Sequence, residues 1–305
     1  SLHAAAKKIN LHGIFVPLTT PFDAQEHIAY DKLQKNLAAY ERVPFTGYVV
    51  SGSNGEAPAL KPEERVELVK KVREHVGKNK VVIGGATNES TNTTCEICEA
   101  MAKEGADGVL VMTPFYFKKR MTEEAIIQHF TIVADRSPVP VVIYNMAMVT
   151  GIDIAIPTLT RLAQHPNIAG VKDGDVRKIA GTILETKKKG VDFEVLAGSA
   201  GYLLPAIQSG SCGGVNGLAG ALGPEVCQLY DLTTQEKYKE AINLHFRITK
   251  ADTLLLAELG VPGLKAAMDM LGLYGGPCRR PLLSPSSSDI AKIKQVLIGD
   301  GFLKQ

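Results

Sequence analysis

The stretch Asn167-Ile-Ala-Gly-Val-Lys-Asp173 has the pattern of an apolar β-strand that ends in a lysine. Strand side chains alternate between two faces, so Ile168, Gly170 and Lys172 share one face and Asp173 lies on the other. In a barrel of parallel strands this pattern points Lys172 inward at the rim. Lysine is among the residues least often buried, and an enclosed amine that loses its proton can attack a carbonyl group. We therefore predict that Lys172 is a catalytic nucleophile. The alternative is a structural lysine paired with Asp173, which the alternation disfavours.

Short β-branched runs like this one alternate with amphipathic helical stretches along the first part of the chain. The stretch 62–76, for example, repeats valines on one helical face. Eight such units over residues 1–223 predict a (β/α)₈ TIM barrel, in the α/β class. A doubly wound sheet is the alternative, but it usually has fewer strands and a GxGxxG motif, which is not present. The candidate strands are residues 14–18, 48–50, 81–83, 109–112, 141–144, 168–172, 193–196 and 213–216.

The pattern changes from about residue 224 onward, where strand signals stop. Helical patterns cover residues 224–232, 235–256, 263–271 and 288–297. We see no linker before them. The prediction is a catalytic barrel domain, residues 1–223, with a helical extension, residues 224–305, packed on it.

Composition excludes several classes of function. The 305 residues include 34 basic and 32 acidic side chains, a net charge of +2 that gives no electrostatic reason to bind nucleic acid or an anionic membrane. No apolar run approaches the roughly 20 residues needed to span a bilayer. Five scattered cysteines predict reduced thiols in an intracellular protein. The cytoplasm and the mitochondrial matrix are the compartments that we expect. The histidines lack metal-ligand spacing, so we predict neither a metal nor a cofactor.

Other candidate site residues follow the predicted strands, where barrels place their active sites. The turn Ser51–Glu56 is rich in small residues whose N–H groups could hold a carboxylate, although an ordinary turn also uses glycine. Tyr144 shares the inward parity of Val142 and would need a hydrogen-bond partner. Aromatic residues at 113–117 suit either a pocket or a subunit contact. Glycine-rich segments at 196–201 and 209–217 suit either phosphate or an uncharged substrate tail.

Together these motifs resemble the dihydrodipicolinate synthase / N-acetylneuraminate lyase family of pyruvate-dependent class I aldolases. The resemblance covers nearly the whole chain, and within the family it is strongest to the 4-hydroxy-2-oxoglutarate aldolases. The family motifs are residues 13–22, 52–56, 113–116, 144–145, 150–151, 170–173 and Gly198, and those of the branch are Ser53-Asn54, 164–168, 196–201 and 274–279.

The resemblance implies roles for particular residues. Lys172 would form the Schiff base, and Tyr144 would shuttle protons at the substrate oxygen. Ser53 would link Tyr144 to Tyr116, which in the family enters from a neighbouring subunit. The backbone at Ser53 and Asn54 would hold the pyruvate carboxylate.

The resemblance also implies substrate contacts at Gly198 and Val215, and a homotetramer built as a dimer of dimers. Two departures bear on the substrate. Val149 stands where synthases carry an arginine that binds the second substrate's carboxylate, and a valine cannot make that contact. The segment Lys172–Asp175 is shorter than the usual loop after the lysine and lacks its serine or threonine.

We therefore expect a class I lyase that cleaves a 4-hydroxy-2-oxo acid, with 4-hydroxy-2-oxoglutarate giving pyruvate and glyoxylate as the leading case. One alternative is an aldolase acting on a 2-keto-3-deoxy sugar acid. The shortened loop motivates another, a catalytically silent barrel that binds a keto acid.

Overall fold

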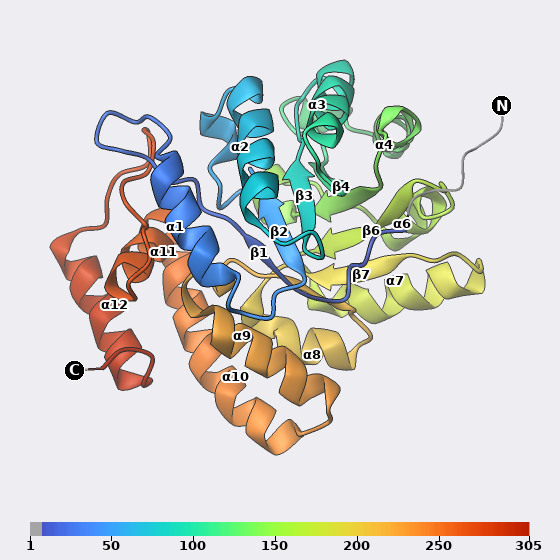
Figure 1. Ribbon diagram of the computed structural model, residues 1–305. Helices are drawn as coiled ribbons and strands as arrows, with labels where there is room; N and C mark the ends of the chain where they lie inside the picture. The colour runs from blue at the N-terminus through green and yellow to red at the C-terminus, as the bar shows by residue number, and fades with distance from the viewer. Residues whose placement is uncertain (1–7, 305) are drawn as a thin grey trace.

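Eight parallel strands form a closed barrel in sequential order, which confirms the predicted (β/α)₈ architecture. The structure is a computed structural model that describes residues 8–304. In Figure 1 the strands lie at the centre and the helices of the repeating units surround them. The strands are β1 (Gly13–Pro17), β2 (Gly47–Val50), β3 (Val81–Gly85), β4 (Gly108–Met112), β5 (Val141–Asn145), β6 (Ile168–Asp173), β7 (Glu194–Ala197) and β8 (Gly213–Val215).

Each strand is followed by at least one helix. The α-helices are α1 (Tyr30–Tyr40), α2 (Pro62–His75), α3 (Thr91–Lys103), α4 (Glu123–Arg136), α5 (Ala147–Thr150), α6 (Ile156–Leu162), α7 (Val176–Lys188), α8 (Leu203–Gln208), α9 (Ala219–Thr234), α10 (Tyr238–Asp252), α11 (Gly260–Met270) and α12 (Ser287–Gly299). Three short 3₁₀ turns, η1 (Ala57–Ala59), η2 (Lys118–Arg120) and η3 (Ala200–Tyr202), and a π-helical segment, η4 (Thr253–Glu258), complete the elements.

The position of α9 leads us to propose a boundary between barrel and extension later than residue 223. α9 follows β8 and packs against β1 and α8, so it occupies the place of the eighth barrel helix. It begins at Ala219, with a kink at Leu222, and residue 223 therefore falls inside an element. We propose that the extension starts after Thr234 and consists of α10 to α12.

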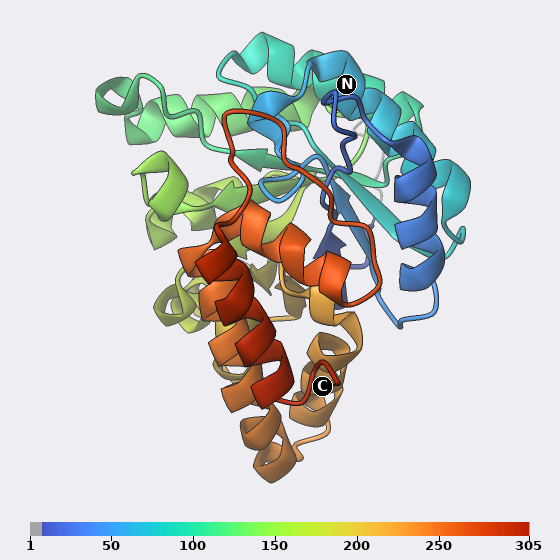
Figure 2. The ribbon, with the colours of Figure 1, turned by 90° about the vertical axis from the view of Figure 1, so that its left-hand side faces the viewer.

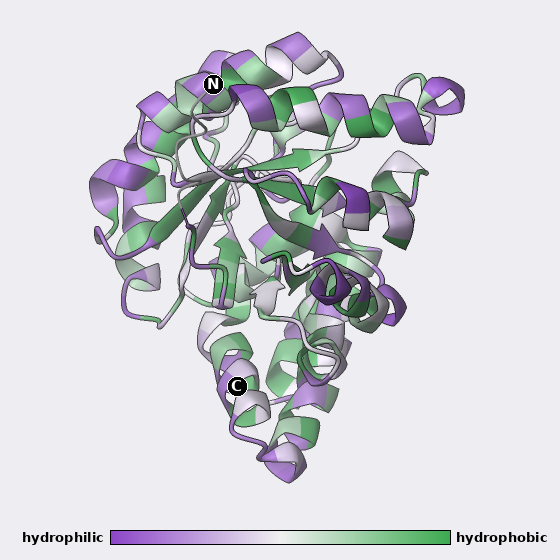
Figure 3. Cartoon of the chain, turned by 90° about the vertical axis from the view of Figure 1, so that its right-hand side faces the viewer, coloured by the Kyte–Doolittle hydropathy of each residue, from purple (hydrophilic) through white to green (hydrophobic). Residues whose placement is uncertain are grey.

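Alternation along the strands sorts side chains between two cores. In β5, Val142 and Tyr144 face the barrel interior, whereas Val141 and Ile143 pack outward in the larger core between strands and helices. The register of β5 with β6 pairs Tyr144 with Lys172. In Figure 3 most of the strand ribbon is coloured as hydrophobic, whereas the helices around it carry both hydrophilic and hydrophobic residues. The inward parity predicted for Tyr144 is thus confirmed.

Closure of the barrel depends on a glycine in its shortest strand. Gly213 pairs with Gly13, and a Cβ built on Gly213 would lie 1.9 Å from the Gly13 carbonyl oxygen. Gly213 is therefore needed for the close contact between β8 and β1, whether or not the segment 209–217 also binds a ligand.

We expect Gly213→Ala to lower the free energy of unfolding by about 3 kcal/mol, because the backbones of β1 and β8 must separate to admit the methyl group. Urea unfolding would measure the loss. Gly299→Ala is the control, since nothing lies within 4 Å of a Cβ at Gly299, and an equal effect of both changes would contradict this account.

The segment between α11 and α12 runs back across the N-terminal part of the chain, as Figure 2 shows. Tyr274 donates its hydroxyl hydrogen bond to the Phe22 carbonyl at 2.6 Å. Arg279 forms two hydrogen bonds with Glu64, at 2.8 and 2.9 Å. These contacts fix the extension to the loop that follows β1 and to the first turn of α2.

The cysteines behave as ordinary packing residues. All five are unpaired and buried, as the sequence predicted. Cys95 and Cys98 lie within α3, and burial raises the pKa of the Cys98 thiol to about 12, which disfavours the reactive thiolate. Within residues 8–304 no cluster of three or more His, Cys, Asp or Glu side chains could hold a metal ion. No helix in the same range has the length and apolarity required to cross a membrane.

Candidate active site

A cavity of about 270 Å³ lies at the carboxyl ends of the strands, where the barrel opens toward the extension. Strand ends, the loops after them and the C-terminal extension all contribute to its wall. The lining residues are Pro17, Val49, Gly52, Ser53, Asn54, Leu110, Tyr144, Met146, Met148, Val149, Lys172, Gly174, Gly198, Ser199, Tyr202, Gly217, Asp252, Leu256 and Ala257. Four of the predicted catalytic or binding residues besides Lys172 are among them: Tyr144, Ser53, Asn54 and Gly198.

Lys172 reaches this cavity from the end of β6. Its side chain is only 6% exposed, and its Nζ lies 4.0 Å from the centre of the Tyr144 ring. Among residues 8–304 no carboxylate lies within ion-pair distance of Lys172. The amine is thus enclosed by protein yet open to the cavity, which is the arrangement that attack on a bound carbonyl requires.

Asp173 faces away from Lys172, so the alternative of a structural pair is wrong. Its carboxylate accepts hydrogen bonds from the Asn145 amide at 3.2 Å and the Asp175 N–H at 2.8 Å. The nearest cation is Lys178, 3.8 Å away. Burial raises the pKa of Asp173, while these hydrogen bonds and Lys178 oppose the rise. Asp173 therefore holds the end of β6 in place and leaves Lys172 free.

The turn after β2 has the geometry of an anion-binding cradle. Two non-glycine residues, Ser51 and Glu56, adopt left-handed backbone conformations with φ of 59° and 58°. Within the turn the N–H groups of Gly55 and Glu56 donate to backbone carbonyls. The N–H groups of Ser53 and Asn54 donate no hydrogen bond to any described residue. Two neighbouring unpaired N–H groups at the rim of a cavity suit a carboxylate.

Two glycines set the shape of the same cavity. A Cβ on Gly198 would lie 3.0 Å from both the Asp173 carbonyl and the Tyr202 hydroxyl. A Cβ on Gly217 would lie 2.5 Å from the Asn54 side-chain nitrogen. Sequence reasoning noted the glycines around Gly217 but could not assign this one, because Asn54 is distant in the chain.

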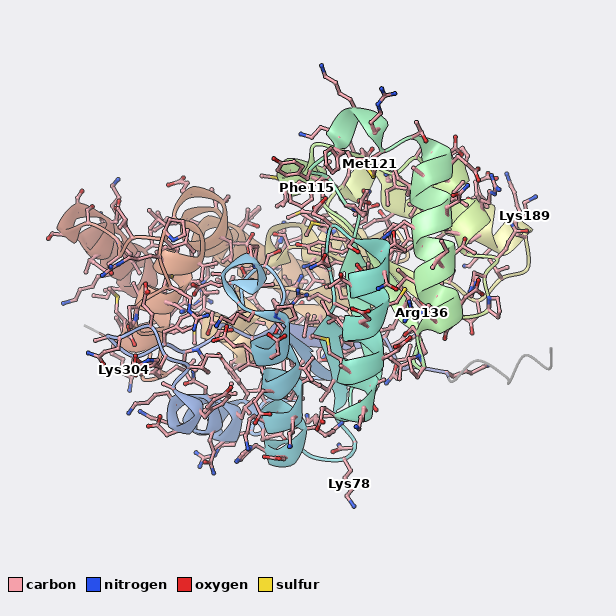
Figure 4. All side chains as sticks on the ribbon, turned by 90° about the horizontal axis from the view of Figure 1, so that it is seen from above. Lys78, Phe115, Met121, Arg136, Lys189 and Lys304 are labelled. Carbon is pink, nitrogen blue, oxygen red and sulfur yellow. The ribbon has the colours of Figure 1, made fainter. Side chains whose placement is uncertain are left out.

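Two predicted residues lie outside the cavity. Val215 is buried in the core of the barrel interior, below the rim, and does not line the cavity. Tyr116 is 77% exposed, and its ring packs edge-on against Phe117 with ring centres 5.1 Å apart. Figure 4 shows Phe115 and Met121 on the loop that carries these aromatics. A link from Ser53 to Tyr116 would therefore need a second subunit, and it stays a prediction.

The structure adds two polar residues that the sequence analysis did not name individually, Ser199 within the glycine-rich segment 196–201 and Asp252 in the extension. Ser199 and Asp252 line the cavity, and the Ser199 hydroxyl donates to Asp252 Oδ2 at 2.6 Å. Burial raises the pKa of Asp252, although the bond from Ser199 opposes the rise. The available signal was an aspartate on the apolar face of the helical pattern, beside Ile248 and Ala251, which are both buried.

The remaining wall is apolar. Met146, Met148 and Val149 come from α5 and the residue before it. Among the residues that the structure describes, Lys172 is the only cation that lines this cavity. The short segment after Lys172 continues directly into α7, because Asp175 caps that helix by accepting the Arg177 N–H at 2.9 Å. No loop is left there to reach over the cavity.

Comparison with known proteins gives a consistent result. Residues 10–298 match the model of the dihydrodipicolinate synthetase family. A 4-hydroxy-tetrahydrodipicolinate synthase from Methanospirillum hungatei is 31% identical over 93% of this chain and 98% of its own. A probable mitochondrial 4-hydroxy-2-oxoglutarate aldolase from Emericella nidulans is 31% identical over 93% of each chain. The synthase name is the more frequent among such relatives.

Solved structures agree. The crystal structure of dihydrodipicolinate synthase DapA-2 from Bacillus anthracis superimposes with a TM-score of 0.90 at 29% identity, covering 95% of this chain and 98% of that one. The fold, the family model and the relatives all point to an enzyme of the aldolase and lyase type. The chain belongs to the dihydrodipicolinate synthetase family.

Proposed function

We propose that this protein is a pyruvate-dependent class I aldolase that cleaves a 4-hydroxy-2-oxo acid through an imine on Lys172. The observation that carries the proposal is the enclosed Lys172 amine beside Tyr144, in a cavity that also contains the free N–H groups of Ser53 and Asn54. A nucleophile, a phenol and an anion cradle are the groups that such a reaction needs.

In the proposed reaction the N–H groups of Ser53 and Asn54 hold the substrate's C1 carboxylate. Lys172 Nζ adds to C2, and loss of water leaves a protonated imine. Tyr144 relays the proton from the C4 hydroxyl as the C3–C4 bond breaks. The electron pair of that bond enters the imine to form an enamine, and the aldehyde leaves. Protonation at C3 and addition of water then release pyruvate and restore the amine.

Two substrates fit this class. The name of the Emericella nidulans relative supports 4-hydroxy-2-oxoglutarate, which would yield glyoxylate beside pyruvate. The apolar wall, and a lining in which the described residues supply no cation besides Lys172, support a 2-keto-3-deoxy sugar acid, whose distal part is uncharged. We do not propose the synthase reaction, because no arginine among residues 8–304 lines this cavity to hold the carboxylate of a second substrate.

A pyruvate-release assay tests the proposal. Purified enzyme would be supplied with 4-hydroxy-2-oxoglutarate and with 2-keto-3-deoxy sugar acids, and pyruvate would be followed with lactate dehydrogenase. Condensation of pyruvate with aspartate semialdehyde would be measured in parallel. Pyruvate release from a 4-hydroxy-2-oxo acid supports the proposal, whereas activity in the synthase assay alone would overturn it.

Tyr144→Phe tests the proton relay separately from imine formation. We expect kcat for cleavage to fall about 10²- to 10⁴-fold, since the phenylalanine cannot carry the C4 proton. Borohydride should still trap pyruvate on the variant, because the lysine remains. Leu110→Val, a change in the same lining without a proton-carrying group, is the control. A Tyr144→Phe enzyme as fast as its parent would exclude the relay.

We also propose that the enzyme is an intracellular homotetramer, assembled as a dimer of dimers. The exposure of Tyr116 and Phe117, at 77% and 67%, supports a subunit contact at this loop. Such a contact would allow Tyr116 of one subunit to complete the site of the next.

A further inference from the structure

The C-terminal extension supplies part of the cavity wall that the proposed reaction does not use. Asp252 is the last residue of α10, and the π-helical η4 follows it at once. Leu256 and Ala257, both in η4, line the cavity together with Asp252. Single π-helical segments are frequent at functional sites. Because Lys172 lines the same cavity, a substrate bound at the lysine has its distal part within the same enclosed space.

Asp252 retains hydrogen-bonding capacity that the protein does not satisfy. The residue is only 7% exposed, and no cation among residues 8–304 lies within ion-pair distance of it. Oδ2 accepts from Ser199, but Oδ1 is buried and has no partner among the described residues. A carboxylate can accept about four hydrogen bonds, and an unsatisfied buried acceptor is costly. The side chain is therefore prepared to accept a hydrogen bond from a ligand.

Ser199 orients this acceptor. Its hydroxyl oxygen accepts the Gly201 N–H at 3.0 Å, so its proton is directed to Asp252. Asp252 could have a purely structural role in connecting α10 to the turn at η3. That role does not explain the hydrogen bond between Ser199 and Asp252. Thr249 of α10 already makes that connection by donating to the Gly201 carbonyl at 3.2 Å.

We propose that Asp252, positioned by Ser199, is a specificity-determining residue that accepts a hydrogen bond from a hydroxyl group on the aldehyde-derived half of the substrate. Among residues 8–304 this cavity is lined by no cation besides Lys172, which is committed to C2, so Asp252 would repel a distal carboxylate placed beside it. The inference rests on the proposed function and refines it. In this proposal Asp252 favours hydroxylated aldehydes over glyoxylate as the second product, and therefore favours 2-keto-3-deoxy sugar acids as substrates.

The test compares aldehydes in condensation with pyruvate. Glyceraldehyde and propanal have the same carbon chain and differ in hydroxyl groups, and glyoxylate carries a carboxylate. For the parent enzyme we expect kcat/KM to be roughly 10- to 100-fold higher with glyceraldehyde than with propanal, the range of a hydrogen bond to a charged group. Asp252→Leu should reduce this ratio to near one, mainly through KM for glyceraldehyde.

Additional variants keep the test informative if Asp252→Leu folds poorly. Asp252→Asn preserves the shape but presents an amide, so it should gain activity with glyoxylate relative to the parent. Ser199→Ala, like Asp252→Leu, should lower the ratio of kcat/KM for glyceraldehyde to kcat/KM for propanal. Glu258→Gln, which removes one negative charge from an exposed position of η4, is the matched control and should leave the ratio unchanged.

Trapping with borohydride separates this inference from the proposed function. If the variants form the pyruvate adduct but keep the parent's preference among aldehydes, the role of Asp252 is overturned and the aldolase remains. A parent enzyme that prefers glyoxylate would also overturn it. If the parent itself forms no pyruvate adduct, the proposed function fails first.

Discussion

Replacement of Lys172 with alanine is expected to lower kcat for aldol cleavage on the order of 10⁴-fold or more. The reason is that no other side-chain amine from the described part of the chain, residues 8–304, lines the cavity, so the variant cannot form an imine there. Lys172→Arg should be equally inactive, because a guanidinium keeps the positive charge but does not act as the nucleophile. Pyruvate release under saturating substrate measures both effects.

The control for this prediction is Lys189→Ala, since Lys189 is an exposed lysine at the C-terminal cap of α7. It should retain the activity of the parent. Circular dichroism of the Lys172 variants should show an unchanged fold, because Lys172 makes no ion pair with any described residue. Cleavage by Lys172→Ala at a rate comparable to the parent would contradict the proposed mechanism.

Lys265→Met is expected to produce the largest loss of stability, about 3–5 kcal/mol in the free energy of unfolding. Lys265 is 1% exposed, and its Nζ lies 2.6 Å from Glu56 Oε1, whose side chain is equally buried. The amine also donates to the carbonyls of Thr20 at 2.7 Å and Pro277 at 3.0 Å. Removal of the lysine would leave the Glu56 carboxylate buried without its cation.

Urea unfolding of a double variant tests this explanation. Lys265→Met combined with Glu56→Gln should recover part of the lost stability, because the second change removes the unpaired charge. Lys71→Met breaks only two surface pairs, with Glu67 and Glu74, and should cost less than about 1 kcal/mol. A Lys265→Met protein as stable as its parent would show that the buried pair contributes nothing.

The ion pair between Lys265 and Glu56 also supports the turn that forms the anion cradle. Glu56 ends the turn that contains Ser53 and Asn54, and its Oε2 accepts the Arg279 N–H at 2.8 Å. The extension therefore holds the anion cradle through Lys265 and Arg279. Sequence reasoning treated the extension only as a helical domain packed on the barrel.

The barrel could be predicted because local patterns determine it. Each buried strand is a short apolar run, and the predicted strands differ from the observed ones by at most two residues at either end. Strand alternation also sufficed to point Tyr144 and Lys172 into the interior.

The parts that escaped prediction depend on contacts between distant segments or on unusual backbone. The stretch 235–256 looked like one helix, whereas the structure ends α10 at Asp252 and continues as η4. Asp252 reaches the cavity only because the extension folds back onto the barrel. The anion cradle depends on left-handed φ angles at Ser51 and Glu56. Serine and glutamate seldom adopt this conformation, so their presence in the sequence does not predict it. Val215 was assigned to the site by resemblance, and the register of β8 places it deeper in the barrel.

The most direct test of the central claim is to locate the imine. The protein would be incubated with pyruvate, reduced with borohydride, digested, and its peptides analysed by mass spectrometry. We predict one pyruvate-derived addition, on the peptide that contains Lys172, and none in Lys172→Ala. The absence of any adduct, or an adduct on another lysine that persists in Lys172→Ala, would contradict the account.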